Sequence, residues 1–153
     1  MQHFGDLILT FLMAMVPVVE LRGAIPFGVA RGVGIWQAII AAILGNLLPS
    51  PFIILFIRRI FAWLRRRSDK LNALVNRLEA RAEGKMDTVR RYAFWGLVIL
   101  VAIPLPGTGA WTGSLVAAMM DLRLRKSLPA ITLGVVIAAV VVSVITYGVT
   151  VVF

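Results

Sequence analysis

Two Pro- and Gly-rich segments interrupt the apolar runs of this chain, and they constrain its fold more than any other feature. They cover residues 17–26 (PVVELRGAIP) and 104–113 (PLPGTGAWTG). The apolar limbs beside the first segment, residues 7–19 and 24–33, have only about half to two-thirds of the roughly 20 helical residues that cross a bilayer. Interrupted backbone at membrane depth is tolerated only where protein buries it or where it lines a cavity, so we expect a functional site at these segments.

The amino-acid composition is that of a membrane protein. Apolar residues make up 60% of the chain, and the mean hydropathy of +0.93 is well above soluble usage. The length suits a single membrane domain over residues 1–153. The chain has no cysteine, and His3 is its single histidine. We therefore expect no metal site and no cofactor. No nucleophile–base pair is visible in the sequence either, so we expect no enzymatic activity.

Basic residues are concentrated in one segment. Of the sixteen Lys and Arg residues, eleven lie between positions 58 and 91. No nucleic-acid recognition motif accompanies them, so we expect no nucleic-acid binding. A basic segment between apolar spans is typical of a cytoplasmic loop. Apolar residues at helical spacing over positions 71–82 predict an amphipathic helix that anchors on an anionic leaflet, and a lipid-gathering role is the alternative.

The chain divides into two units of the same order, each a broken hairpin followed by an uncharged span. The units cover residues 4–57 and 92–153, and the basic connector 58–91 joins them. Leu44-Gly45 lies near the counterpart of Leu133-Gly134, which supports a repeat. The predicted fold is all-α, with two inverted repeats that each consist of a re-entrant helical hairpin and a transmembrane helix.

Two parts of this prediction have alternatives. A single long broken helix over residues 7–33 is the alternative to the first hairpin. The first span, residues 35–57, contains Pro49 and Pro51, which remove backbone donors and predict a kink or local unwinding. Asn46 lies beside this kink and becomes a gating candidate, although a simple packing kink explains it equally well.

The positive-inside rule orients this arrangement. If the connector is cytoplasmic, the first hairpin enters from outside, the second enters from the cytoplasm, and both termini lie outside. We expect a multi-pass protein of the inner membrane of a prokaryote. Since two hairpins and two spans enclose little volume, we also expect a homo-oligomer, with a dimer as the first choice.

Glu20 and Arg22 are the ionisable residues deepest in apolar sequence. Such residues usually pair and usually mark a transport pathway. In the functional interpretation, Arg22 binds an anionic group, and Glu20 titrates and couples movement to protons. In the structural alternative, the two form an ion pair, or one of them pairs with Asp121 or Arg31, only to stabilise the fold.

The second segment is uncharged but offers other groups to a ligand. Its glycines allow a close approach to the backbone, its threonines offer hydroxyls, and the N-terminus of the next helix attracts anions. The substrate-binding candidates are Glu20, Arg22, Gly23, Pro26, Gly107, Thr108, Gly109, Trp111 and Thr112. The candidates for coupling or gating are Glu20, Asn46, Asp121 and Arg123.

Both segments resemble those of a known family. ELRGAIP at residues 20–26, followed by PLPGTGAWTG, is similar to the putative small multidrug export proteins over nearly the whole chain. That family looks like a compact relative of the DedA (VTT-domain, SNARE-associated-like) membrane proteins, which implies paired re-entrant hairpins in inverted repeat. The DedA relatives are implicated in moving anionic lipids, including undecaprenyl phosphate, with acidic and arginine residues at the hairpins. Glu20 and Arg22 match that pattern, whereas Gly107-Thr108-Gly109 replaces the charged residues of the second hairpin.

Our leading hypothesis is therefore a translocase for an anionic lipid-linked phosphate such as undecaprenyl phosphate. Its partners would be membrane lipids, with protons or another ion driving transport. The alternative is a proton-coupled exporter of small molecules, including drugs, that uses Glu20. A third hypothesis, supported by the basic connector, is a lipid-sensing or scaffolding membrane subunit.

Overall fold

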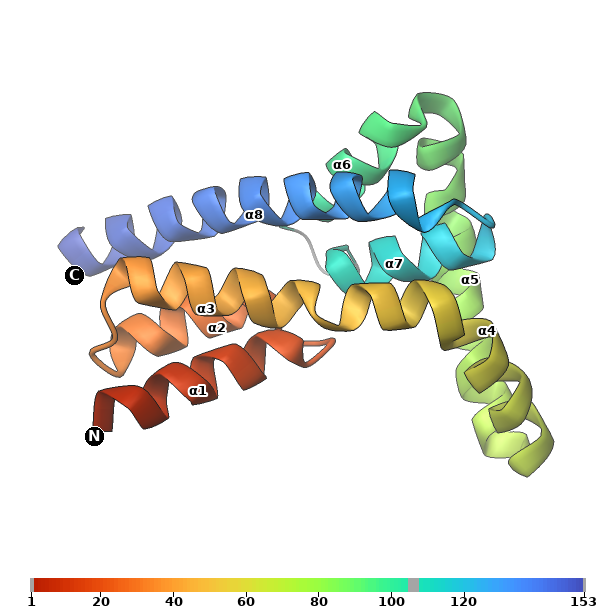
Figure 1. The fold of residues 1–153 in the computed structure, drawn as a ribbon, viewed down its shortest axis with the longest axis horizontal. Coiled ribbons are helices and arrows are strands. Elements are labelled where there is room, and N and C mark those ends of the chain that lie inside the picture. Colours follow the sequence, from red (N-terminus) through yellow and green to blue (C-terminus); the bar gives the residue numbers. More distant parts are fainter. Residues whose placement is uncertain (1, 105–107, 153) are drawn as a thin grey trace.

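A computed structural model describes residues 2–104 and 108–152, except for the side chains of Thr88 and Thr150. Within these ranges the chain forms eight α-helices and no strand. Figure 1 shows long helices lying side by side, with both chain termini at one end of the molecule and the connector helix at the other. The predicted all-α class is confirmed.

The first half begins with a pair of short helices, α1 (Gln2–Met15) and α2 (Glu20–Ala30). These two helices lie side by side in opposite directions and both pack on α3 (Ile35–Leu47), as Figure 1 shows. Helix α4 (Pro49–Arg67) continues from α3. The interruption between them is confined to Leu48, whose φ of −57° and ψ of −44° are helical. The prolines thus interrupt the helix without unwinding it.

The connector contains α5 (Asp69–Tyr92), the predicted amphipathic helix, whose presence is confirmed. Ser68 caps it, since its Oγ accepts a hydrogen bond from the Leu71 N–H at 3.2 Å. Val75, Ala82 and Val89, spaced seven residues apart, are buried where α5 packs on neighbouring helices. Three further helices follow: α6 (Phe94–Ala102), α7 (Ala110–Met119) and α8 (Leu124–Val152).

Within the described residues, two segments are long and apolar enough to cross a membrane. They are Ile35–Arg67, which joins α3 and α4, and Leu124–Val149 in α8, with mean hydropathies of 2.2 and 2.7. Both contain most of a span that the sequence predicted. The shorter α1 and α2, with 14 and 11 residues, reach only about 21 and 17 Å at 1.5 Å per residue, less than a hydrocarbon core of about 30 Å.

The first break is shorter than predicted. The expected turn covered residues 17–26, with the second apolar limb beginning at residue 24, but α2 starts at Glu20 and contains Pro26. Leu21, Ala24 and Ile25 are buried on one face of α2, and this packing outweighs the backbone hydrogen bond that Pro26 removes. In the second segment α7 starts at Ala110, so residues 110–113 are helical.

Glycines allow close packing at equivalent places in the two halves. A Cβ at Gly45 on α3 would overlap the backbone carbonyl oxygen of Phe11 on α1. A Cβ at Gly134 on α8 would lie 2.9 Å from the carbonyl oxygen of Val98 on α6. In each half, a glycine of the long helix therefore lets the first helix of the short pair approach backbone to backbone, as is common between membrane helices.

Candidate functional site

The two breaks in the short helix pairs meet and exchange hydrogen bonds. The indole Nε1–H of Trp111, at the start of α7, donates to the carbonyl oxygen of Met15, the last residue of α1, at 2.9 Å. The Nη2 of Arg22, at the start of α2, donates to the carbonyl oxygen of Ile103, just after α6, at 2.9 Å. The α6–α7 pair thus supplies a donor to the carbonyl at the end of α1, and the α1–α2 pair supplies one to the carbonyl after α6. The carbonyl groups at a helix C-terminus lack hydrogen-bond donors within their own helix.

Glu20 connects the first break to the start of α7. Its Oε1 accepts a hydrogen bond from the backbone N–H of Trp111 at 3.3 Å, and its side chain is buried. The N-terminus of a helix carries unsatisfied N–H groups and a partial positive charge, so a carboxylate is stabilised there. Glu20 itself has a φ of +49°, a strained conformation that costs about 1–3 kcal/mol and persists only when the surroundings hold it.

Gly109 is required by the position of this carboxylate. Its φ of +115° is strained for any L side chain, and a Cβ at this position would overlap the Glu20 carboxylate. The predicted glycine and the predicted acid are therefore direct neighbours. This contact explains why the second segment has a glycine where it faces the one carboxylate of the first.

Arg22 and Thr108 stabilise the opposite end of the second break. Thr108 Oγ1 accepts from Arg22 Nη2 at 2.8 Å and donates to the Ile103 carbonyl oxygen at 2.6 Å. This carbonyl follows the C-terminus of α6, where the helix dipole is negative and a cation is favourable. Glu20 and Arg22 therefore complement the two helix ends at the second break. Glu20 lies at the positive N-terminus of α7, and Arg22 lies at the negative C-terminus of α6.

A cavity of about 390 Å³ lies at the meeting point of the breaks. Helices α2, α4, α5 and α7 and the break residues contribute its walls. The lining residues are Pro17, Val18, Glu20, Arg22, Ile53, Ile57, Phe61, Leu78, Arg81, Ala82, Thr108, Trp111, Thr112 and Leu115.

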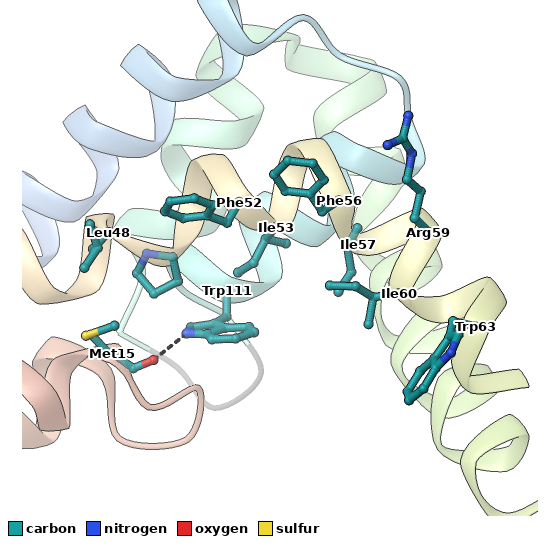
Figure 2. A pocket seen from close by; sticks show the side chains of 11 residues that line it. Met15, Leu48, Phe52, Ile53, Phe56, Ile57, Arg59, Ile60, Trp63 and Trp111 are labelled. Carbon is teal, nitrogen blue, oxygen red and sulfur yellow. Dashed lines mark hydrogen bonds between the residues drawn. The ribbon is translucent and has the colours of Figure 1, made fainter. Parts of the chain in front are cut away.

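An apolar groove of about 970 Å³ adjoins this cavity along α4, and the two share Ile53, Ile57 and Trp111 as lining residues. Figure 2 shows Leu48 and Met15 at one end of the groove and Trp63 at the other, with Trp111 beside Met15 and between these ends. The remaining lining residues are Pro49, Phe52, Phe56, Arg59 and Ile60. The cavity offers polar groups within mostly apolar walls, a combination suited to an amphipathic molecule, whereas the adjoining groove is almost entirely apolar.

Most of the chain matches a known protein family. The family described as "Putative small multi-drug export protein" matches residues 20–141. The chain belongs to this family. The match covers all lining residues of the cavity except Pro17 and Val18. No curated protein and no solved structure matches the chain.

Four predicted substrate-binding residues of this export-family protein lie away from the cavity wall or outside the described chain. Gly23 is needed for packing, since a Cβ there would lie 2.6 Å from Val19 Cγ1. Pro26 lies in α2 without lining the cavity. Gly109 adjoins the Glu20 carboxylate without lining the cavity, and Gly107 lies outside the described residues. Glu20, Arg22, Thr108, Trp111 and Thr112 all line the cavity.

The predicted gating residues are not brought together. Asn46 is buried in α3, with no hydrogen-bond partner for its Oδ1 within the described part of the chain. Asp121 pairs with Arg58 at 2.8 Å, and Arg123 accepts the Ser127 N–H through its carbonyl oxygen at the start of α8. Arg31 pairs with Asp6 at 2.9 Å. The expected alternative, in which Asp121 or Arg31 neutralises Glu20 or Arg22, is therefore wrong.

Sequence reasoning missed Arg81, the cavity residue contributed by the connector helix. The available signal was its position beside Leu78 and Ala82, which belong to the predicted apolar face of α5. The sequence predicted that the whole connector lies on the membrane surface. The position of Arg81 in the cavity depends on the packing of α5 against α6 and α7.

Proposed function

We propose that this export-family protein carries small amphipathic molecules across a membrane and binds them where the two helix breaks meet. The observation that carries the proposal is the cavity at the meeting point of the breaks, in which Glu20, Arg22, Arg81, Thr108 and Thr112 lie among mostly apolar residues, so that it accommodates both a polar group and an apolar body. The family description supports export. Transport would proceed without any chemical step on the molecule carried.

We propose that α1–α2 and α6–α7 are re-entrant hairpins in inverted repeats. Three observations support this: the shortness of these helices, the exchanged hydrogen bonds of Trp111 and Arg22, and the equivalent glycines Gly45 and Gly134. The same arrangement supports kinship with the DedA proteins. A homo-oligomer, with a dimer as the first choice, would enlarge the enclosed volume.

The proposed orientation places α5 in the cytoplasm and both termini outside, in a prokaryotic inner membrane. Its support is that α5 and the termini lie at opposite ends of the molecule (Figure 1) and that the basic residues cluster at the α5 end.

Glu20 is the proposed coupling group. Its carboxylate carries a negative charge toward the positive end of α7. When a proton binds this carboxylate, the charge disappears and the attraction to the Trp111 N–H weakens, which releases the start of α7. Loss of the proton restores the contact. Because α7 lines the cavity, this exchange would link proton movement to a change in cavity shape.

The test is efflux of fluorescent amphipathic dyes from proteoliposomes with and without a proton gradient. We expect gradient-driven transport in the native protein and loss of the gradient effect in Glu20→Gln. An absence of dye transport by folded, reconstituted protein across a panel of cationic, neutral and anionic dyes would overturn the proposal.

A second candidate function is translocation of an anionic lipid-linked phosphate, and one observation favours it. Arg22 and Arg81, two guanidinium groups suited to phosphate, line the same cavity. Translocation of labelled undecaprenyl phosphate in liposomes, lost in Arg22→Gln, would support this candidate. Unchanged translocation in Arg22→Gln would remove it.

A further inference from the structure

The groove along α4 exposes large apolar side chains at its surface. Phe52, Phe56, Ile60 and Trp63 are between 42% and 58% exposed and lie along one side of the helix (Figure 2). A contiguous apolar surface of this kind normally has something bound to it. The groove belongs to a segment long and apolar enough to span a membrane, so acyl chains of the bilayer are the molecules next to it.

The part of the groove between Leu48 and Arg59 matches one leaflet. Over this part the helix rises about 17 Å at 1.5 Å per residue, close to the roughly 15 Å of half a hydrocarbon core. Trp63 lies about 6 Å further along α4, in the interfacial region where tryptophan is enriched. The inner end lies at the helix breaks, at Leu48 and Met15, and the outer part carries Arg59. The dimensions therefore suit one acyl chain whose head group lies at the level of Arg59.

The charges at the outer end favour an anionic head group. Arg58 pairs with Asp121, and Arg65 pairs with Glu79. Within the described part of the chain, Arg59 has no carboxylate partner, and it is the charged residue that lines the groove. A cation at the membrane surface without a protein partner attracts anionic lipid head groups.

We propose that this groove binds one acyl chain of an anionic bilayer lipid from the leaflet on the α5 side, with the head group at Arg59. The site is distinct from the transport cavity. It adjoins the cavity through Ile53, Ile57 and Trp111, so a bound lipid forms part of the wall between the cavity and the bilayer. The proposal concerns a resident lipid and does not depend on what the protein carries.

Trp111 provides the measurement, because it lines the inner half of the groove. The protein with Trp36→Phe, Trp63→Phe and Trp95→Phe retains Trp111 as its single tryptophan. It is reconstituted with lipids brominated in mid-chain, which quench tryptophan on contact. Brominated phosphatidylglycerol is titrated into plain phosphatidylcholine, and brominated phosphatidylcholine into plain phosphatidylglycerol. A matched protein that retains only Trp36, which is 76% exposed on α3, reports the surrounding bilayer.

We expect half-maximal quenching of Trp111 at an about five-fold lower fraction of the brominated anionic lipid than of the brominated zwitterionic lipid, the factor expected for one interfacial arginine. The Trp36 protein should show no such preference. Arg59→Gln should abolish the preference at Trp111, whereas Arg66→Gln, an exposed residue of α4 outside the groove, should retain it.

Equal half-maximal fractions for the two lipids at Trp111 would overturn the proposal, as would a preference that survives Arg59→Gln. Quenching measures binding and not transport, so a failed efflux assay leaves this result unaffected. Far-UV circular dichroism of each variant establishes that the helices are intact before the titration.

Discussion

The carboxylate of Glu20 accepts a hydrogen bond from the backbone N–H of Trp111, 91 positions further along the chain. The bond joins the first break to the start of the helix that follows the second. Together with the bonds from Trp111 to Met15 and from Arg22 to Ile103, it makes each half of the molecule complete the broken helices of the other. The helix ends are stabilised only when both halves are in place.

Replacement of Gly109 by alanine tests this contact. The new Cβ would overlap the Glu20 carboxylate, and the φ of +115° would be strained. We expect the unfolding free energy to fall by about 1–3 kcal/mol from the strained backbone alone, together with a loss of transport. Gly84→Ala on α5 is the control, because a Cβ there has open space; it should keep or raise stability. Thermal unfolding in detergent compares the two variants, and equal melting temperatures would contradict the contact.

Replacement of Trp111 by phenylalanine removes the indole N–H but keeps most of the ring volume. The Met15 carbonyl then loses its partner, and we expect a loss of about 0.5–1.5 kcal/mol. Trp36→Phe removes an exposed indole and should leave stability unchanged. Chemical unfolding in mild detergent measures both. The exchange of hydrogen bonds between the halves would be refuted if the two substitutions had the same effect.

Local sequence patterns predicted much of this fold for clear physical reasons. Helical spacing of apolar residues identified α5, and Pro17 and Gly109 marked breaks that exist. The boundaries were less accurate, because burial of Leu21 and Ile25 keeps α2 helical through Pro26. Boundaries of this kind depend on tertiary packing, which a local pattern does not contain.

The candidate site was predictable in its residues and not in its contacts. Charge inside apolar sequence singled out Glu20 and Arg22, and both line the cavity. Their positions at the ends of α7 and α6 depend on segments more than 80 residues apart, for which the sequence offers no spacing rule. Arg81 was missed for the same reason, since its place depends on how α5 packs.

Substitutions of Glu20 separate its structural role from its coupling role. Glu20→Gln keeps an oxygen that accepts the Trp111 N–H, so we expect a nearly native melting temperature together with transport that no longer responds to a proton gradient. Glu20→Ala removes the acceptor as well and should lower stability by about 1–3 kcal/mol. Proteoliposome efflux and thermal unfolding give the two readouts. Gradient-driven transport by Glu20→Gln would rule out the coupling role.

The absence of cysteine makes the proposed orientation directly testable. Single cysteines are placed at Gln2, at the start of α1, and at Lys85, on α5. The start of α1 and helix α5 lie at opposite ends of the molecule (Figure 1). A membrane-impermeant thiol reagent added to intact cells should label Gln2→Cys and leave Lys85→Cys unlabelled until the cells are opened, because the basic α5 end is expected to stay in the cytoplasm. Labelling of Lys85→Cys alone in intact cells would reverse the orientation. Labelling of both from outside would show that the two ends are on the same side, which excludes the inverted arrangement of the halves.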